Sequence, residues 1–173
     1  MRIVAGRWRG RVIKAPPGER VRPTSDRVRE AWMSMVQPRL PGATVLDLFA
    51  GSGALGLEAL SRGAARVDFV DSSAASLRAL AENARALDAG DAAVAHRADA
   101  LRFVSALEAR AYDVAFADPP YRQGLATRLA EQWARVPFAT ILGIEHAADE
   151  ALADGGDTRR YGSTAITLYR APA

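Results

Sequence analysis

The chain has 173 residues, of which 49% are hydrophobic and 25% charged, with a net charge of +3. This composition predicts one soluble globular domain of ordinary size. The sequence contains no cysteine and only two histidines, which excludes disulfides and thiolate sites and disfavours a histidine-built metal site. No apolar run reaches membrane-spanning length and the first ten residues lack an apolar signal segment, so we expect a cytoplasmic protein without metal or membrane span.

Positive charge gathers in the first part of the chain. Residues 1–40 carry ten basic and three acidic residues, a net charge of +7, whereas the rest sums to −4. Such a segment indicates a polyanionic partner, most often a nucleic acid, although a solvated charged surface gives the same pattern. We therefore predict an RNA-binding extension over 1–40, followed by the single globular domain over 41–173. The candidate RNA-binding residues are Arg7, Arg9, Arg11, Arg22, Arg27 and Arg29.

The sequence pattern of this extension predicts a short hairpin followed by a helix. Residues 2–22 are punctuated by glycines and by Pro16-Pro17-Gly18, as in a hairpin and a loop. Pro23-Thr-Ser-Asp26 then offers helix caps. The residues that follow have one apolar face at helical spacing, formed by Val28, Ala31, Trp32, Met35 and Val36. Arg27 and Arg29 lie off this face.

From residue 43 onward, short apolar strands alternate with helices. The pattern predicts strands at 44–49, 66–70, 92–96, 112–117 and 140–144, with helices at 54–62, 73–88, 99–109 and 123–135. Buried strands alternating with helices indicate an α/β fold with a parallel sheet covered on both sides. Segments 157–161 and 164–170 flank Gly162-Ser163 and predict a final antiparallel hairpin.

A glycine turn follows the first of these strands. Gly51, Gly53 and Gly56 satisfy G-x-G-x-x-G, which allows a tight turn and close approach of a ligand to the backbone. The motif fits nicotinamide dinucleotides, S-adenosylmethionine, or a tight turn without ligand. Asp47, four residues earlier, would repel a pyrophosphate but suits the ammonium and sulfonium of S-adenosylmethionine.

Acidic residues also follow the next three strands. Asp71, Asp99 and Asp118 each come at or just after a strand end. Because ligands of open α/β sheets bind at the carboxyl ends of the strands, we expect these acids and Asp47 to converge on one cleft. Asp71 is placed to accept ribose hydroxyls and Asp99 an adenine amine, although a single aspartate is more often a helix cap.

The tetrapeptide Asp118-Pro-Pro-Tyr121 indicates chemistry at the fourth strand. Proline lacks an N–H, so this loop presents acceptors without competing donors, which suits the exocyclic amine of a nucleobase. Asp118 and the Pro119 carbonyl would accept the two amine hydrogens, and Tyr121 would stack on the base. A rigid turn with a packing tyrosine is the alternative.

Together these motifs resemble class I S-adenosylmethionine-dependent methyltransferases. Met1–Arg11, Arg22–Ala31 and Leu46–Gly63, in that order, resemble the RsmD family, which methylates guanine N2 in 16S ribosomal RNA. The resemblance implies a Rossmann-like, seven-stranded, mostly parallel fold, S-adenosylmethionine as cofactor and an assembled 30S particle as partner. We also expect a monomer. It implies cofactor roles for Gly51, Gly53, Asp71 and, with less support, Asp99, and catalytic roles for Asp118 and Tyr121.

Three other functions remain open from the residues alone. Asp-Pro-Pro-Tyr also serves adenine-N6 methyltransferases acting on DNA or RNA. A nicotinamide oxidoreductase is disfavoured by Asp47, and an RNA-binding module without catalysis is disfavoured by the intact glycine loop and Asp118. Trp8 either stacks on RNA or anchors the hairpin, Trp133 is expected in the core, and both histidines are expected to be structural.

Overall fold

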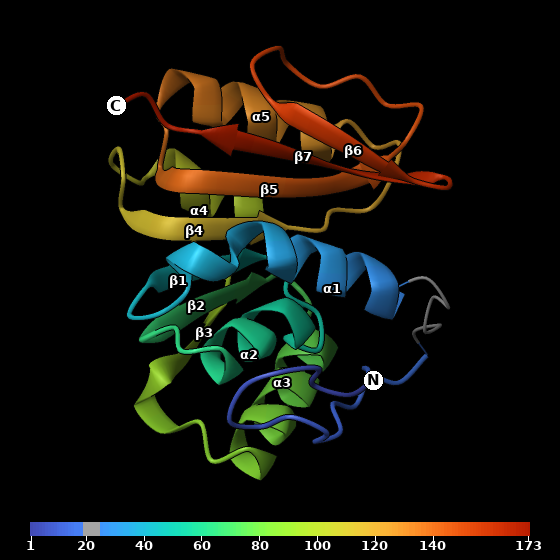
Figure 1. Ribbon diagram of the computed structural model, residues 1–173, viewed down its shortest axis with the longest axis vertical. Coiled ribbons are helices and arrows are strands. Elements are labelled where there is room, and N and C mark those ends of the chain that lie inside the picture. Colours follow the sequence, from blue (N-terminus) through green and yellow to red (C-terminus); the bar gives the residue numbers. More distant parts are fainter. Residues whose placement is uncertain (19–24) are drawn as a thin grey trace.

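A seven-stranded sheet forms the centre of the protein, in a computed structural model that describes residues 1–18 and 25–173 (Figure 1). Its strand order is β3-β2-β1-β4-β5-β7-β6, and all neighbours are parallel except β5–β7 and β7–β6. The predicted α/β fold with a terminal antiparallel hairpin is therefore confirmed. The strands are β1 Thr44–Leu48, β2 Arg66–Asp71, β3 Ala93–Arg97, β4 Tyr112–Ala117, β5 Ala139–Ala147, β6 Asp157–Tyr161 and β7 Thr164–Arg170.

Helices cover both faces of the sheet. Successive strand residues point to opposite faces, so Val45 and Phe116 pack with α1, α2 and α3, whereas Leu46 and Ala117 pack with α4 and α5. Trp133 of α5 lies in the core on the α4 and α5 side of the sheet, as expected, with 8% of its surface exposed. The helices are α1 Ser25–Val36, α2 Ala54–Ser61, α3 Ala74–Ala86, α4 Ala100–Ser105 and α5 Leu125–Arg135, with 3-10 turns at Gln37–Arg39 and Gly90–Ala92.

The strand order reverses between β1 and β4. From β1 the chain builds outward through β2 and β3, then returns to place β4 on the other side of β1. In doubly wound sheets this reversal leaves a crevice at the carboxyl ends of the strands, where ligands bind. The topology thus brings the residues after β1, β2 and β4 to one edge.

The first 18 residues form a loop closed by one antiparallel bridge, between Arg2 and Val12, rather than a hairpin of two strands. Ile3, Trp8 and Ile13 are buried in the same core as the sheet. The backbone N–H of Trp8 donates to the Ser61 hydroxyl at 3.0 Å. Trp8 therefore anchors the loop to α2, and the proposed extension is packed on the sheet instead of standing apart from it.

A buried carboxylate on α2 holds this loop in place. Glu58 is fully buried and accepts hydrogen bonds from the Val4 and Ala5 N–H groups at 2.9 and 3.2 Å. Its oxygens also lie 3.0 Å from Arg62 Nε and 3.7 Å from Arg29 Nε. One acid thus satisfies two backbone donors and faces two largely buried arginines.

In the described part of the chain, no helix combines the length and apolarity needed to cross a bilayer. Both histidines lie in strands and bond to protein groups. His96 lies 3.1 Å from an Asp68 oxygen, and His146 lies 2.8 Å from the Thr167 hydroxyl. These contacts support the structural roles expected from the sequence.

We predict that Glu58→Ala lowers the free energy of unfolding by about 3–5 kcal/mol, because it leaves buried arginine charge without its partner. Denaturant unfolding followed by circular dichroism measures this change. The matched control is Glu82→Ala, at an exposed position of α3, which should change stability by no more than about 0.5 kcal/mol. Equal stabilities of the two variants would contradict the assigned role.

Candidate active site

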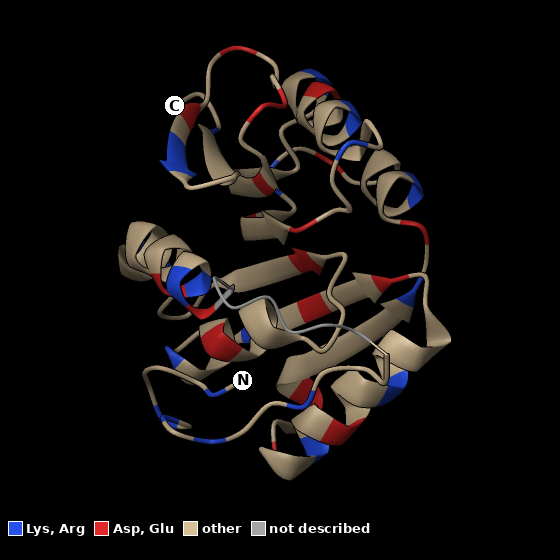
Figure 2. Cartoon of the chain, turned by 90° about the vertical axis from the view of Figure 1, so that its right-hand side faces the viewer, with Lys and Arg blue, Asp and Glu red and all other residues tan. Residues whose placement is uncertain are grey.

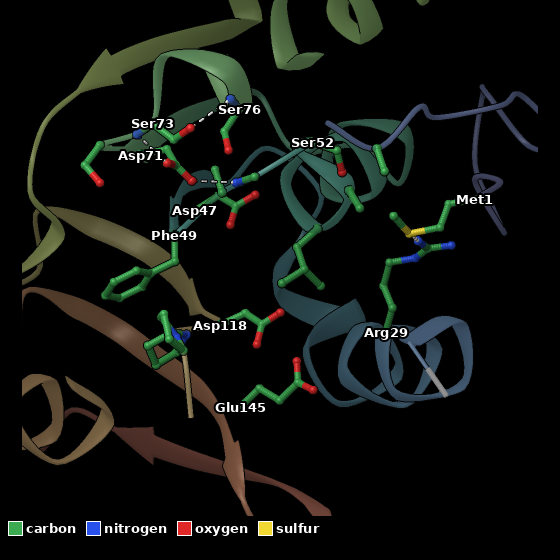
Figure 3. A pocket seen from close by; sticks show the side chains of 18 of the residues that line it. Met1, Arg29, Asp47, Phe49, Ser52, Asp71, Ser73, Ser76, Asp118 and Glu145 are labelled. Carbon is green, nitrogen blue, oxygen red and sulfur yellow. Dashed lines mark hydrogen bonds between the residues drawn. The ribbon is translucent and has the colours of Figure 1, made fainter. Parts of the chain in front are cut away.

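A cavity of about 820 Å³ opens at the carboxyl ends of the parallel strands (Figure 3). Its walls come from the loops after β1, β2 and β4, from the end of β5, from α1 and from the first residues of the chain. Four carboxylates face it: Asp47, Asp71, Asp118 and Glu145. The remaining lining residues are Met1, Ala15, Arg29, Trp32, Phe49, Ala50, Gly51, Ser52, Ala54, Leu55, Ser72, Ser73, Ser76, Pro119 and Pro120.

The glycine turn after β1 needs two of its glycines for different reasons. Gly51 has φ of +55°, lines the cavity and has open space where a side chain would begin. Gly53 has φ of +85°, and a Cβ there would lie 2.3 Å from Leu80 Cδ1. Gly51 can therefore contact a ligand through its backbone, whereas Gly53 does not line the cavity and instead lets α2 begin against α3.

Asp71 fixes the shape of this turn. One carboxylate oxygen accepts the Gly51 N–H at 2.8 Å and the other accepts the Ser73 N–H at 2.8 Å. The side chain is half-buried at the cavity edge, and each oxygen keeps a second lone pair for a ligand hydroxyl. Asp71 thus lies at the cavity, as expected from the sequence for an acid at the end of β2.

Asp47 is buried at the floor of the cavity with 1% exposure. Its carboxyl accepts the Gly56 N–H at 2.9 Å. Burial raises the pKa of Asp47 to about 8, the Gly56 hydrogen bond opposes that rise, and the nearby charge of Asp71 adds to it. At neutral pH and without a ligand, Asp47 is therefore mostly protonated, and a cation beside it would favour the ionised form.

The loop after β4 brings Asp118 and Pro119 to the opposite wall. Ala117 pairs with Ile144 in the parallel register of β4 and β5. Asp118, the next residue after Ala117, is therefore placed beside Glu145, the next residue after Ile144. Both side chains line the cavity (Figure 3). Sequence reasoning missed Glu145, although a glutamate inside the apolar strand Ala139–Ala147 was a usable signal.

Tyr121 does not line the cavity, which differs from the expectation that it stacks on a base. Its hydroxyl donates to Glu145 Oε1 at 2.9 Å and lies 2.9 Å from the Thr164 hydroxyl oxygen. Burial raises the pKa of Tyr121, and the charge of Glu145 contributes to the rise. Tyr121 is therefore a neutral hydrogen-bond partner of Glu145 in this structure.

Asp99 also departs from the sequence expectation. It is exposed, does not line the cavity, and caps α4 by accepting the Arg102 N–H at 2.9 Å. This is the helix-cap alternative for a single aspartate. Three of the four acids expected to converge, Asp47, Asp71 and Asp118, do line one cavity.

The candidate RNA-binding arginines differ in their environments. Arg7, Arg9, Arg11 and Arg27 are exposed, and Figure 2 shows basic residues along the N-terminal loop. The Arg7 guanidinium lies 4.2 Å from the centre of the Trp8 ring, and Arg11 Nη2 donates to the Ala86 carbonyl at 2.6 Å. Arg22 lies outside the described residues.

Arg29 corrects the sequence expectation, because it is buried with only 4% exposure. Its Nη2 donates to the Arg2 carbonyl at 2.5 Å, and its Nη1 donates to the Met1 sulfur at 2.9 Å. These contacts hold the start of the chain against α1 and make Arg29 part of the cavity wall. It is not an exposed phosphate contact.

Within residues 1–18 and 25–173, no group of three or more His, Asp or Glu side chains is arranged to hold a metal ion. The cavity instead combines a glycine turn, carboxylates on neighbouring strands and a proline loop without backbone donors. Such a site can hold a cationic, hydroxyl-bearing ligand beside a second ligand rich in N–H donors.

The model of the family described as "Conserved hypothetical protein 95" matches residues 1–170. The Escherichia coli K12 relative named ribosomal RNA small subunit methyltransferase D is 43% identical over 125 residues, covering 72% of this chain but only 62% of that protein. A Bacillus subtilis relative, YlbH, named as an rRNA methyltransferase, is 35% identical and aligns over 98% of both chains.

Solved structures show the same similarity. The E. coli protein yhhF, named as a methyltransferase, superposes with a TM-score of 0.83 at 34% identity, covering 98% of this chain and 97% of that one. The Thermus thermophilus methyltransferase RsmC, at 22% identity and a TM-score of 0.69, covers 90% of this chain and 45% of that one, and shares the class I methyltransferase fold. The family match over nearly the whole length, together with these relatives, shows that the chain belongs to the RsmD family.

Proposed function

We propose that this protein transfers a methyl group from S-adenosylmethionine to the exocyclic N2 amine of a guanine in 16S rRNA of the small ribosomal subunit. The observation that carries the proposal is the Asp118-Pro119 loop, which opens into the same cavity as the glycine turn, Asp47 and Asp71. The relatives named as small-subunit rRNA methyltransferases support the RNA substrate, and the resemblance in Asp-Pro-Pro-Tyr supports the amine. We further propose a monomer that acts in the cytoplasm on the assembled 30S particle.

The residues of the cavity fit S-adenosylmethionine. When bound, this cofactor supplies a methyl group on a positively charged sulfur. Asp71 would accept its ribose hydroxyls while holding the Gly51 N–H, and Asp47 would face its positive charge. The Asp71 carboxylate beside the glycine turn would oppose the pyrophosphate of a nicotinamide dinucleotide, which disfavours the oxidoreductase alternative.

Asp118 and Pro119 would orient the target amine. The lone pair of an exocyclic amine is delocalised into the ring, so the free amine is a weak nucleophile. Acceptance of its hydrogens by the Asp118 carboxylate and the Pro119 carbonyl favours a pyramidal nitrogen whose lone pair points toward the cofactor. The amine loses its proton only after it has been alkylated, so the residues need geometry more than basicity. The target guanine must leave its stack to reach this position.

The basic loop would contact phosphate groups of the RNA. Arg7, Arg9 and Arg11 are exposed on a loop that Glu58 and Trp8 fix against α2. Met1 and Ala15, at either end of this loop, line the cavity. A rigid basic surface next to the cavity entrance suits RNA docking better than a free arm, because less conformational entropy is lost on binding.

The first prediction from the proposed function concerns Asp47 and the pH dependence of cofactor binding. Because its pKa is about 8 without a ligand, binding of a cation must displace the Asp47 proton at neutral pH. S-adenosylmethionine affinity should therefore rise between pH 6 and 8, by up to about tenfold per unit, with proton release measured by calorimetry in buffers of different ionisation enthalpy. Asp47→Asn should lack this rise. Titration of the ligand's own ammonium affects both proteins equally, so it cancels in the comparison. Parallel pH profiles of affinity for the wild type and the variant would refute the role of Asp47.

The second prediction concerns Asp118. Loss of one aligned polar group at a reacting centre costs about 10²–10³ in rate, so Asp118→Ala should slow single-turnover methylation of 30S particles by that factor at saturating cofactor. Asp118→Asn keeps an acceptor oxygen and should retain more activity than alanine. Cofactor affinity should change little. Asp91→Ala, at an exposed acid away from the cavity, is the control, and equal rates for both alanine variants would show that Asp-Pro-Pro-Tyr is only a turn.

The third prediction concerns the basic loop. Replacement of Arg7, Arg9 and Arg11 by glutamine should weaken 30S binding and flatten its salt dependence, by about 0.7–0.9 in the slope of log K per lost phosphate contact. A filter-binding titration over several salt concentrations measures this slope. The control replaces the exposed Arg102, Arg128 and Arg135 of α4 and α5. The proposal fails if both triple variants show the same slope.

A further inference from the structure

A second carboxylate accompanies Asp118 at the proposed substrate end of the cavity. Glu145 on β5 follows Ile144, the register partner of Ala117, and so occupies the position beside Asp118 on the neighbouring strand. Neighbouring parallel strands lie about 4.7–4.9 Å apart, which lets two such carboxylates reach adjacent groups of one base. Both side chains are on the Trp32 side of the sheet and both line the cavity (Figure 3).

The orientation of Glu145 is fixed by other elements. Its Oε1 accepts the Tyr121 hydroxyl at 2.9 Å, and the same hydroxyl lies 2.9 Å from the Thr164 hydroxyl at the start of β7. Glu145 is 9% exposed, so little of its surface reaches water. A buried acceptor held in this way and facing a cavity is suited to select a ligand by its donors, because a mismatched group would leave it unpaired.

We propose that Glu145 is the residue that selects guanine, by accepting the N1–H of the base while Asp118 accepts the neighbouring N2 hydrogens; this rests on the proposed guanine-N2 activity. The Watson–Crick edge of guanine presents those two donors side by side. Adenine presents an amine beside N1, which carries a lone pair and no hydrogen. With the adenine amine at Asp118, the Glu145 carboxylate would face that lone pair, so two acceptors would oppose each other.

The test removes the N1–H donor of the target base. 30S particles are reconstituted with 16S rRNA that carries either guanine or 2,6-diaminopurine at the position the wild-type enzyme methylates. 2,6-Diaminopurine keeps the N2 amine, has a lone pair at N1 and carries an amine in place of the 6-carbonyl. The change of preference caused by Glu145→Gln, beyond the wild-type preference alone, therefore identifies the contact with N1. Wild-type enzyme should favour the guanine particle in kcat/KM by roughly 10- to 150-fold, the range expected for one hydrogen bond to a charged group.

Glu145→Gln should narrow this preference by at least about tenfold, because the glutamine amide can donate to N1 of 2,6-diaminopurine while its oxygen still accepts from Tyr121. Tyr121→Phe keeps the Glu145 acceptor but removes the hydroxyl that orients it, so its preference should lie between those of the wild type and Glu145→Gln. Glu131→Gln, at an exposed position of α5, is the matched control. Cofactor affinity and thermal unfolding are measured for each variant.

The outcomes separate this inference from the function on which it depends. Absence of methylation on the guanine particle by wild-type enzyme would overturn the proposed function itself. Equal wild-type rates on the two particles would overturn the role of Glu145 while leaving guanine-N2 methylation intact. An unchanged preference in a folded, cofactor-binding Glu145→Gln would do the same. If that variant fails to fold, equal wild-type rates on the two particles would still overturn the role of Glu145.

Discussion

The crowding of carboxylates at one edge of a parallel sheet is the constraint around which the site is built. Parallel pairing and the strand reversal between β1 and β4 bring Asp47, Asp71, Asp118 and Glu145 to one cavity. Four acids in a partly buried space are costly unless each has a partner or a proton. Asp71 bonds to the glycine turn, Glu145 to Tyr121, and Asp47 stays protonated at neutral pH. A cationic cofactor and a donor-rich base edge would complement the charge that remains.

The N-terminal loop links the basic surface to this cavity. Glu58 bonds the loop to α2, and Arg29 bonds the first two residues to α1. Met1 and Ala15 consequently form part of the cavity wall. Apolar side chains of similar size would stabilise the fold about as well as this buried ion network. The network instead determines where the basic side chains lie relative to the proposed reacting groups.

Local sequence patterns predicted the sheet well because strand periodicity and turn chemistry are short-range. β4, β6 and β7 match their predicted ranges, and Gly162-Ser163 forms the expected turn. Strand β5 extends beyond the predicted residue 144 because antiparallel pairing with β7 continues it through Glu145 to Ala147. Pairing between distant segments is not visible in a local pattern, so the last three residues of β5 were not predicted as strand. Arg29 and Asp99 were misplaced for a related reason: helix spacing does not reveal a packed N-terminal loop, and an acid at a strand end equally caps a helix.

We propose that one cavity binds both the methyl donor and a guanine amine of small-subunit RNA. The most direct test of this proposal incubates the purified protein and isotope-labelled S-adenosylmethionine with 30S particles from cells that lack the enzyme, followed by nuclease digestion and mass mapping of the 16S rRNA. The account predicts label on a single N2-methylguanine. Label on N6-methyladenine, or none on 16S rRNA, would contradict it.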